Sequence, residues 1–550
     1  MPSSDDLRAR LRSIDGRGYG AYKDLKGRWD GRRVSLCLDR IQGDPFAAPS
    51  KARLLVQGHG LPEDLASTRV RRAALCDALL DAFAEAVEAL PRVGGSGKSG
   101  RVLVDAGGAE ILERTGCALE GDVLELRFRV GLPAKGRRVL GRAASQLLCE
   151  LLPRASERVR WEHVDQAAVR EHVELAEDHA LLQAELEARG LVAFVRDGSI
   201  LPRESGVSPH PLPGAVPFES PPSLRVTLPT KHHGEVTGMG LPEGVTVITG
   251  GGFHGKTTLL EALEAGVYPH VAGDGREWVV TRSSAVKVRS EDGRSIAGVD
   301  LRPFVRDLPG GRDTAAFSTP DASGSTSLAA AILEALEVGA SALLLDEDTC
   351  ATNLLVADPR MRELVKKEPL TPLVAHVRAL HEVHGVSTLL VTGASSEYLA
   401  VADRVLLLED CVPREVTEEA RALAGAKPAA GEPLALTPRT IQPRSIDSRR
   451  GRRERVRGRG LRELELGEER VDLGALDQLA DPSQVRAIGP ILLALRKHAE
   501  GATLREALEA TMAEVEARGL FALDPSPDLA LPRPFEVAAA LNRLRSLRTG

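Results

Sequence analysis

Residues 245–258 read Val-Thr-Val-Ile-Thr-Gly-Gly-Gly-Phe-His-Gly-Lys-Thr-Thr, and this stretch decides the fold of the 550-residue chain. The β-branched residues at its start predict a buried strand over 245–248. Residues 250–257 then fill the pattern Gly-x-x-x-x-Gly-Lys-Ser/Thr, and apolar residues at helical spacing follow them. A strand, a glycine loop and a helix in this order form the context that a phosphate-binding loop requires.

The residues of this loop suit an anionic ligand. Glycines let backbone N–H groups turn toward an anion, and the helix N-terminus adds the positive end of its dipole. We expect Lys256 to reach the β- and γ-phosphates of a nucleotide and Thr257 to bind Mg²⁺. A chance glycine turn is the alternative, which two motifs downstream disfavour. His254 either lies near the phosphates or packs on the adjacent helix. The predicted nucleotide-binding residues are Gly250, Gly251, Gly252, Phe253, His254, Gly255, Lys256, Thr257 and Thr258.

The composition bounds the class of protein. A content of 43% hydrophobic and 27% charged residues is typical of a globular protein, and the length favours about three or four domains. The net charge of −6 restricts any nucleic-acid surface to a local patch. The cysteines lack Cys-x-x-Cys spacing, which favours reduced thiols in the cytoplasm. No apolar stretch at the N-terminus indicates a signal peptide, and no uncharged run of about 18 residues indicates a membrane span.

A second motif, Ser-Ala-Leu-Leu-Leu-Asp-Glu, occupies residues 341–347. It is an apolar strand that ends in two acids, which is a weak signal alone and a strong one downstream of a phosphate-binding loop. We expect Asp346 to hold Mg²⁺ through water and Glu347 to polarise an attacking water. The predicted catalytic residues are Glu347 and Lys256.

Between these motifs, residues 322–326 read Ala-Ser-Gly-Ser-Thr and open a predicted helix over 328–337. A Ser-Gly-Ser loop that leads through a helix into the Asp-Glu strand resembles the arrangement of ABC ATPases, whose signature is Leu-Ser-Gly-Gly-Gln. The resemblance implies that Ser323, Gly324 and Ser325 contact the γ-phosphate of ATP held by the second subunit of a homodimer.

The resemblance narrows to one family, the predicted ATPases of the ABC class. The segments that carry it are 17–27, 197–203, 250–260, 321–327, 343–353 and 480–484, so it covers nearly the whole chain. It implies a cytosolic, non-transporter ATPase with an ABC-type P-loop core of α/β class. It also implies that the protein uses ATP and Mg²⁺, dimerises and binds RNA or another nucleic acid.

Three departures from the wider ABC pattern bear on the rate of hydrolysis. Gly393 stands where a switch histidine is usual, no clear glutamine follows the first helix, and Thr326 or Ser327 replaces the last residue of the signature. These changes leave ATP binding intact. A slow or non-hydrolysing nucleotide-gated binding switch is therefore one alternative to a hydrolase, and an ATP-driven remodeller of a protein partner is another.

The chain divides into five predicted segments. They are an N-terminal α+β domain at 1–205, a Pro-rich linker at 206–222, the ATPase core at 223–425, an Arg-rich arm at 426–460 and a small, mostly helical domain at 461–550. In the arm, residues 444–460 hold eight arginines and two acids, a local charge of +6. This density predicts a mobile or phosphate-bound segment. The alternatives are RNA or a single strand on one side and a solubilising or membrane-surface linker on the other.

Three loops nearer the N-terminus are candidate contacts. Aromatic and basic residues among the glycines of 16–23 could stack on bases, or the loop is a turn that covers a core edge. The glycine-rich stretch 94–100 fails as a phosphate-binding loop because a strand follows it, so it is a connector or a backbone-phosphate contact. The basic stretch 131–142 is a solvated face or a third contact. The predicted nucleic-acid residues are Arg17, Tyr19, Tyr22, Lys23, Lys98, Arg449, Arg450, Arg452 and Arg453.

Overall fold

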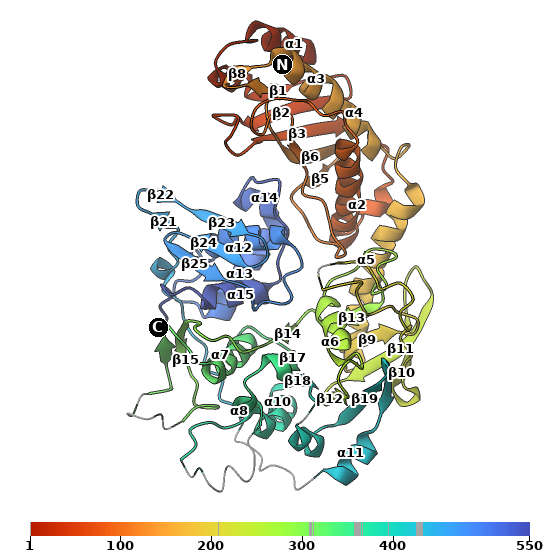
Figure 1. Ribbon diagram of the computed structural model, residues 1–550, viewed down its shortest axis with the longest axis vertical. Coiled ribbons are helices and arrows are strands. Elements are labelled where there is room, and N and C mark those ends of the chain that lie inside the picture. The colour runs from red at the N-terminus through yellow and green to blue at the C-terminus, as the bar shows by residue number, and fades with distance from the viewer. Residues whose placement is uncertain are drawn as a thin grey trace. The chain divides into compact units, whose positions relative to one another are not determined.

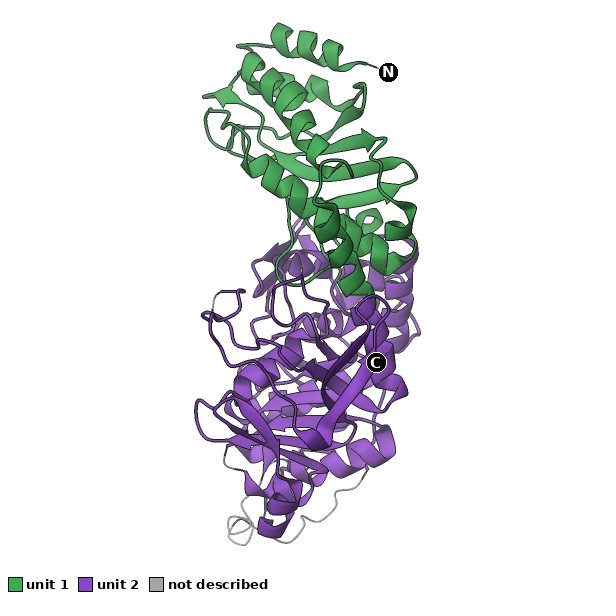
Figure 2. Cartoon of the chain, turned by 90° about the vertical axis from the view of Figure 1, so that its right-hand side faces the viewer, with its two compact units in different colours: residues 1–177, 520–531 green, residues 178–519, 532–550 purple. Residues whose placement is uncertain are grey.

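The computed structural model describes residues 2–206, 208–306, 308, 311, 313–356, 365, 367–393, 395–424 and 433–550. Residue 207 of the predicted linker and residues 426–432 of the predicted arm lie outside the described residues. The chain forms two compact units, residues 1–177 with 520–531 and residues 178–519 with 532–550 (Figure 2). Among the described residues, no helix combines the length and apolarity needed to cross a lipid bilayer.

The first unit is built on an antiparallel sheet. Its strands follow the order β1-β2-β3-β6-β4, with β5 also paired to β6. They are β1 Gly27–Trp29, β2 Val34–Arg40, β3 Ser50–Gln57, β4 Val102–Leu103, β5 Cys117–Glu120 and β6 Val123–Val130. Alternate residues of β3 are buried, which is the pattern of a strand with one covered face. Helix α2 (Arg69–Glu88) covers that face, with the Phe83 and Phe128 rings 5.7 Å apart.

Short helices complete the first unit, and a long one leaves it. They are α1 Ser4–Ser13, α3 Gly141–Gln146, α4 Leu152–Ser156, α5 Gln166–Ala188 and, from the C-terminal part of the chain, α14 Leu520–Leu523. The hydroxyl of Thr115 donates to the carbonyl oxygen of Ser526 at 2.8 Å, which ties residues 520–531 to this unit.

The second unit contains the predicted ATPase core (Figure 1). Its central sheet has the order β14-β17-β18-β12-β19-β20, parallel except for the last strand. The strands are β12 Val245–Gly250, β14 Ala285–Lys287, β17 Ala342–Asp346, β18 Ser387–Val391, β19 Arg404–Glu409 and β20 Val412–Glu415. Every residue of β17 and β18 is buried, as in a parallel sheet covered on both faces. The prediction of an α/β P-loop core is confirmed.

Helices cover the two faces of this sheet. Leu343 and Leu345 of β17 share one hydrophobic cluster with α7 (Gly324–Glu337) and α10 (Val377–His384). Leu344, on the opposite face, shares another cluster with α6 (Lys256–Ala265). Because the strands are parallel, β12, β17 and β18 all end at one edge of the sheet, and the loops that follow them lie there together.

A smaller antiparallel sheet flanks the core in the order β10-β11-β9-β13. Its strands are β9 Leu191–Arg196, β10 Arg225–Pro229, β11 Glu235–Pro242 and β13 Val279–Thr281. A two-stranded sheet pairs β15 (Ile296–Val299) with β16 (Phe317–Thr319), directly before the predicted signature. This pairing places the predicted signature beside residues 293–294, which follow β14.

The C-terminal part combines helices with a small sheet. The helices are α12 Pro482–Leu495, α13 Leu504–Arg518 and α15 Pro534–Asn542, and the strands are β21 Arg449–Arg450, β22 Arg453–Glu454, β23 Val456–Arg459, β24 Glu463–Leu466 and β25 Glu469–Asp472. Strands β23, β24 and β25 pair antiparallel, and β23 lies on α12, where Val456 meets Gly489 so closely that a Cβ there would clash. Of the arm, which was predicted to be mobile or bound to phosphate, Arg449, Arg450, Arg453, Arg457 and Arg459 lie on strands.

Candidate nucleotide site and basic surface

The loop at 250–257 closes between β12 and α6. Gly250 has a φ of 146°, and a Cβ on it would lie 2.4 Å from the carbonyl oxygen of Leu408 on β19. Gly255 has a φ of 89° and is the N-cap of α6. Both residues have a positive φ, which favours glycine, and Gly250 also leaves no room for a side chain. These constraints account for the two glycines of the pattern.

Lys256 folds back over this loop. Its Nζ donates hydrogen bonds to the carbonyl oxygens of Gly250 at 2.8 Å and Gly251 at 2.7 Å. The positive charge is thereby held at the loop, beside the N-terminus of α6, where an anionic phosphate is favoured.

The helices that begin at the two glycine motifs lack side-chain caps. No side chain caps the described N-terminus of α6 or of α7, whereas α1, α12 and α13 each carry a complete capping box. The first N–H groups of any helix have no acceptor within it, so those of α6 and α7 remain for an external acceptor. Helices α10 and α15 also lack a side-chain cap, so this feature permits an anionic ligand at α6 and α7 and does not by itself assign one.

Asp346 ends β17 at the same edge of the sheet as the loop. The residue is 3% exposed, and its Oδ1 accepts the Asp348 N–H at 3.1 Å. Thr257 is exposed on the first turn of α6. A carboxylate and a hydroxyl are oxygen donors of the kind that Mg²⁺ takes together with waters and phosphates, so these residues fit the metal that the pattern implies.

Glu347 is held by the loop that follows β18. Its Oε2 accepts the Thr392 hydroxyl at 2.5 Å and the Gly393 N–H at 3.0 Å, and its Oε1 accepts the Ser395 hydroxyl at 2.8 Å. This loop occupies the place where a switch histidine is usual. The sequence pattern singles out Gly393 but not these two hydroxyls, although they stand on either side of the glycine, just after a strand.

The predicted signature opens α7. Ser323 is exposed and is the N-cap of the helix, with extended backbone. Ser325 donates its hydroxyl to Oδ1 of Asn353 at 2.8 Å. The loop is anchored from behind, since Ala322 accepts from the Gly293 N–H and donates to the Arg294 carbonyl oxygen. The segment thus has a fixed base, with Ser323 exposed and the half-buried Ser325 bonded to Asn353.

His254 fastens the phosphate-binding loop to the turn between β19 and β20. Its Nδ1 accepts the Asp410 N–H at 2.7 Å. The adjacent helix is not the contact of this nitrogen, and proximity to the phosphates stays a prediction. Cys411 follows Asp410 and lines a pocket with Gly255 and Thr258. The apolar walls of this pocket come from Leu201, Pro202, Val216, Phe218, Leu259 and Leu408.

The prediction that Tyr19 and Tyr22 stack on nucleic-acid bases is wrong. The residues are 4% and 0% exposed, and their rings pack edge to face with centroids 5.1 Å apart. Their hydroxyls donate to the carbonyl oxygens of Leu132 and Pro133 at 3.2 and 2.6 Å. Burial raises the pKa of both phenols above the ordinary value. The loop covers a core edge, which was the alternative; Arg17 and Lys23 are exposed beside it.

The backbone amides of the glycine-rich stretch 94–100 form hydrogen bonds within the protein. The N–H groups of Ser96, Lys98 and Gly100 donate to the carbonyl oxygens of Ala134, Pro45 and Gly131. These amides are therefore unavailable to a phosphate, and the connector interpretation describes the loop better. Lys98 itself is half-buried.

An arginine-covered surface lies on the sheet of β23, β24 and β25. Glu465, on the central strand, is opposite Arg457 of β23 and Arg470 of β25. Arg455 donates to its Oε2 at 2.5 and 2.8 Å, and Arg459 lies 2.9 Å from its Oε1. Although burial alone would raise it, these arginines hold the pKa of Glu465 below its ordinary value. We call Arg455, Arg457, Arg459 and Arg470 the arginine face.

A hairpin extends this surface. Strands β21 and β22 carry Arg449, Arg450 and Arg453, all exposed, with exposed Arg452 at the turn. Arg449 lies 3.4 Å from Asp447 and Arg450 lies 3.6 Å from Glu468. Within the described part of the chain, no ion pair is found for Arg452 or Arg453. The hairpin therefore adds uncompensated positive charge to the surface.

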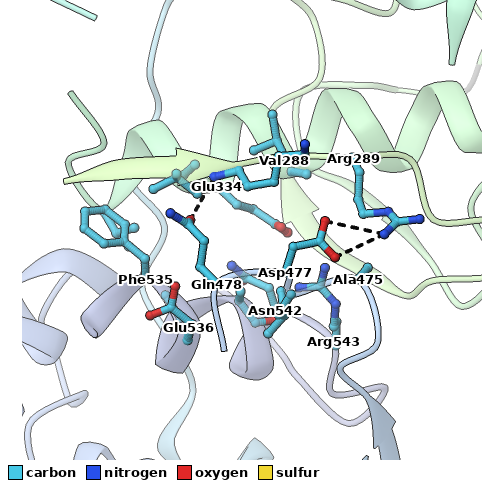
Figure 3. Close-up of a pocket in the computed structure, with 18 of the residues that line it drawn as sticks. Val288, Arg289, Glu334, Ala475, Asp477, Gln478, Phe535, Glu536, Asn542 and Arg543 are labelled. Carbon is cyan, nitrogen blue, oxygen red and sulfur yellow. Dashed lines mark hydrogen bonds and ion pairs between the residues drawn. The ribbon is translucent and has the colours of Figure 1, made fainter. Parts of the chain in front are cut away.

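A pocket marks the junction between α15, the segment before α12 and the core (Figure 3). Gln478 fills the exposed edge of β14: it accepts the Lys287 N–H at 2.9 Å and donates to the Ala285 carbonyl oxygen at 3.3 Å. Arg543, which follows α15 directly, pairs with Glu291 at 2.6 Å, close to the base of the signature. The C-terminal elements and the ATPase core thus share hydrogen bonds and ion pairs within one unit.

Models of known protein families match three regions of the chain. A P-loop domain model of ABC ATPases matches residues 165–441, a model of the N-terminal region of ATPases of the ABC class matches 4–162, and the MRB1590 C-terminal domain model matches 455–550. The chain belongs to the ATPases of the ABC class. Membership of this family implies that the protein binds a nucleotide.

One curated relative is the uncharacterized protein MJ1628 of Methanocaldococcus jannaschii. It is 32% identical to this chain over 241 residues, which are 42% of this chain and 52% of the relative. The chain thus spans about half the length of the relative it matches.

Proposed function

We propose that this protein hydrolyses ATP, that ATP closes a homodimer, and that closure is coupled to the binding of RNA. The observation that carries the proposal is the gathering of the phosphate-binding loop, Asp346 and an oriented Glu347 at one edge of the core sheet. Family membership supports it.

The proposed reaction uses residues with distinct tasks. Lys256 and the amides of the loop and of α6 bind the β- and γ-phosphates and stabilise the charge that develops there. Glu347 accepts a proton from the water that attacks the γ-phosphorus, and the bond to the ADP oxygen breaks. Thr257 and Asp346 would hold Mg²⁺, which neutralises phosphate charge. We propose that the apolar pocket beside Gly255 binds the adenine ring of the nucleotide.

The signature supports the dimer. Ser323 and the uncapped N-terminus of α7 can bind an anion, and we assign to Ser323, Gly324 and Ser325 the γ-phosphate of ATP on the partner subunit. Each subunit then supplies half of two composite sites, and ATP joins them.

The arginine face and the hairpin are the proposed RNA contacts. Exposed arginines on a sheet suit phosphates and stack on unpaired bases, which favours a single-stranded region of RNA. The free thiols of the described cysteines are consistent with a cytoplasmic location.

The test combines two measurements on the full chain. Steady-state hydrolysis is followed with Mg²⁺, with and without single-stranded RNA, and RNA affinity is measured with and without ATP. We expect Mg²⁺-dependent hydrolysis and an RNA affinity that changes with ATP. ATP-dependent RNA binding without hydrolysis would establish the nucleotide-gated switch instead. The remodeller would be favoured by hydrolysis without RNA binding, together with a partner protein that still co-purifies with this chain after nuclease treatment.

A further inference from the structure

The loop after β18 holds the carboxylate of Glu347. Thr392 and Ser395 together direct two hydroxyls at the carboxylate of Glu347, one to each oxygen. The Gly393 N–H adds a third donor. A carboxylate with donors on both oxygens cannot rotate without breaking at least one bond, so its orientation is set by this loop.

We propose that Thr392 and Ser395 are positioning residues for ATP hydrolysis and take over, in this chain, the orienting task for which other ABC ATPases use a histidine. The inference rests on the proposed function, because it assigns Glu347 the role of base. Neither hydroxyl needs to touch the nucleotide for this task.

The fold explains why these two residues can act on Glu347. Strands β17 and β18 are parallel neighbours with Asp346 opposite Val391, so the residues that follow them, Glu347 and Thr392, meet at the sheet edge. The Thr392 N–H donates to the carbonyl oxygen of Ile248, which fixes the loop to the strand before the phosphate-binding loop.

The Thr392 hydroxyl has two bonds that together define the turn. It donates to Glu347 and accepts the Ser395 N–H at 3.0 Å. Thr392 is 2% exposed, so water has little access to its hydroxyl. The hydrogen bond to Glu347 is therefore not readily replaced by one to water. The same turn places the Ser395 hydroxyl on the other carboxylate oxygen.

The consequence for catalysis follows from geometry. A base acts on the attacking water only when its oxygen is held within hydrogen-bond reach along the line of attack. Misplacement by about 1 Å can lower a rate by about 100-fold. Loss of one hydroxyl should therefore reduce kcat by about 10- to 100-fold and leave KM for ATP within about twofold of wild type.

The test compares isosteric and conservative variants of the full-length protein. Thr392→Val removes the hydroxyl and keeps the shape, whereas Thr392→Ser keeps the hydroxyl; Ser395→Ala and Ser395→Thr form the second pair. We expect the two variants without a hydroxyl to lose kcat, the two with one to recover most of it, and all four to bind ATP with wild-type affinity. Thermal unfolding of each variant checks that the fold is intact.

A double variant distinguishes a Thr392 that acts by positioning Glu347 from one that acts on the reaction independently. In a Glu347→Gln background, Thr392→Val should not lower the residual rate further, because the group it positions is already lost. A wild-type kcat in both hydroxyl-free variants, an increased kcat, or an equal loss in the Glu347→Gln background would each overturn the inference. A wild-type protein that hydrolyses no ATP, with or without RNA, would instead overturn the proposed function on which it rests.

Discussion

At the scale of single residues, the nucleotide site separates binding from chemistry. Lys256 belongs to the loop and is bonded to its carbonyl groups, whereas Glu347 stands after a different strand and is bonded to Thr392, Gly393 and Ser395. The two residues follow different strands and have different partners, so removal of either should affect a different step.

We expect Lys256→Ala to abolish ATP binding, because it removes the cation at the phosphates, and Glu347→Gln to retain ATP and trap a dimer, because only the proton acceptor is lost. Equilibrium binding of labelled ATP and mass photometry check these outcomes. Hydrolysis at the wild-type rate by Glu347→Gln would show that another residue is the base.

A second residue-scale prediction concerns Asp81 in the first unit. Burial, and then the charge of Asp77, raise the pKa of Asp81 to about 6 from 3.8. Since the folded state binds this proton more tightly, its stabilising contribution is fully present below pH of about 4 and is lost as the pH rises through about 6.

Asp81→Asn should therefore raise the free energy of unfolding at pH 8 by up to about 3 kcal/mol and have little effect at pH 4. The amide oxygen can still accept the Gly107 N–H that the carboxylate accepts at 2.7 Å. Calorimetry at both pH values checks the prediction; equal changes at pH 4 and pH 8 would show that the pKa of Asp81 is not raised.

At the scale of elements, the N-terminus of α7 decides whether two subunits share a site. Its first turn lacks a side-chain cap and Ser323 is exposed, so it can complete a site on a second subunit. If it does, a subunit that lacks the loop lysine and one that lacks the signature should complement each other.

We expect neither Lys256→Ala nor Ser323→Arg protein alone to hydrolyse ATP, and an equimolar mixture to recover part of the activity, since one of the two composite sites in a mixed dimer is intact. Native mass spectrometry measures the fraction of mixed dimers. Mixed dimers without recovered hydrolysis would exclude the shared site.

At the scale of the whole molecule, charge is distributed unevenly. The chain carries −6 overall, which disfavours general binding of polyanions, while residues 444–460 carry +6. RNA affinity should therefore depend on the arginine face and the hairpin far more than on the remaining basic surface.

Replacement of Arg449, Arg450, Arg452 and Arg453 by Gln should weaken RNA binding and flatten its salt dependence. Each lost phosphate contact should lower the slope of log affinity against log salt by about 0.7. Hydrolysis without RNA should be unchanged. The matched control replaces Arg10, Arg12, Arg32 and Arg33, which are also exposed and change the net charge by the same amount. An unchanged slope in the first variant would assign RNA binding elsewhere, with Arg17 and Lys23 as the next candidates.

The sequence by itself determined the features whose physics is local. A strand, a glycine turn with positive φ and an uncapped helix occupy one short stretch, so residues 245–258 identify the phosphate-binding loop without the rest of the chain. The same holds for the Asp-Glu strand and for the start of α7, because each is a run of adjacent residues. The α/β class of the core and the family follow from these runs.

Only the tertiary structure decided which residues meet across the chain. Whether Tyr22 is exposed depends on a carbonyl group 111 residues away, and the pattern of Tyr and Gly is the same in either case. The donors on Glu347 come from a loop 45 to 48 residues later, which becomes adjacent only when β17 and β18 pair. The arginines of 444–460 form a surface because strand pairing sets Arg457 and Arg470 on either side of Glu465, a register that charge density alone does not specify.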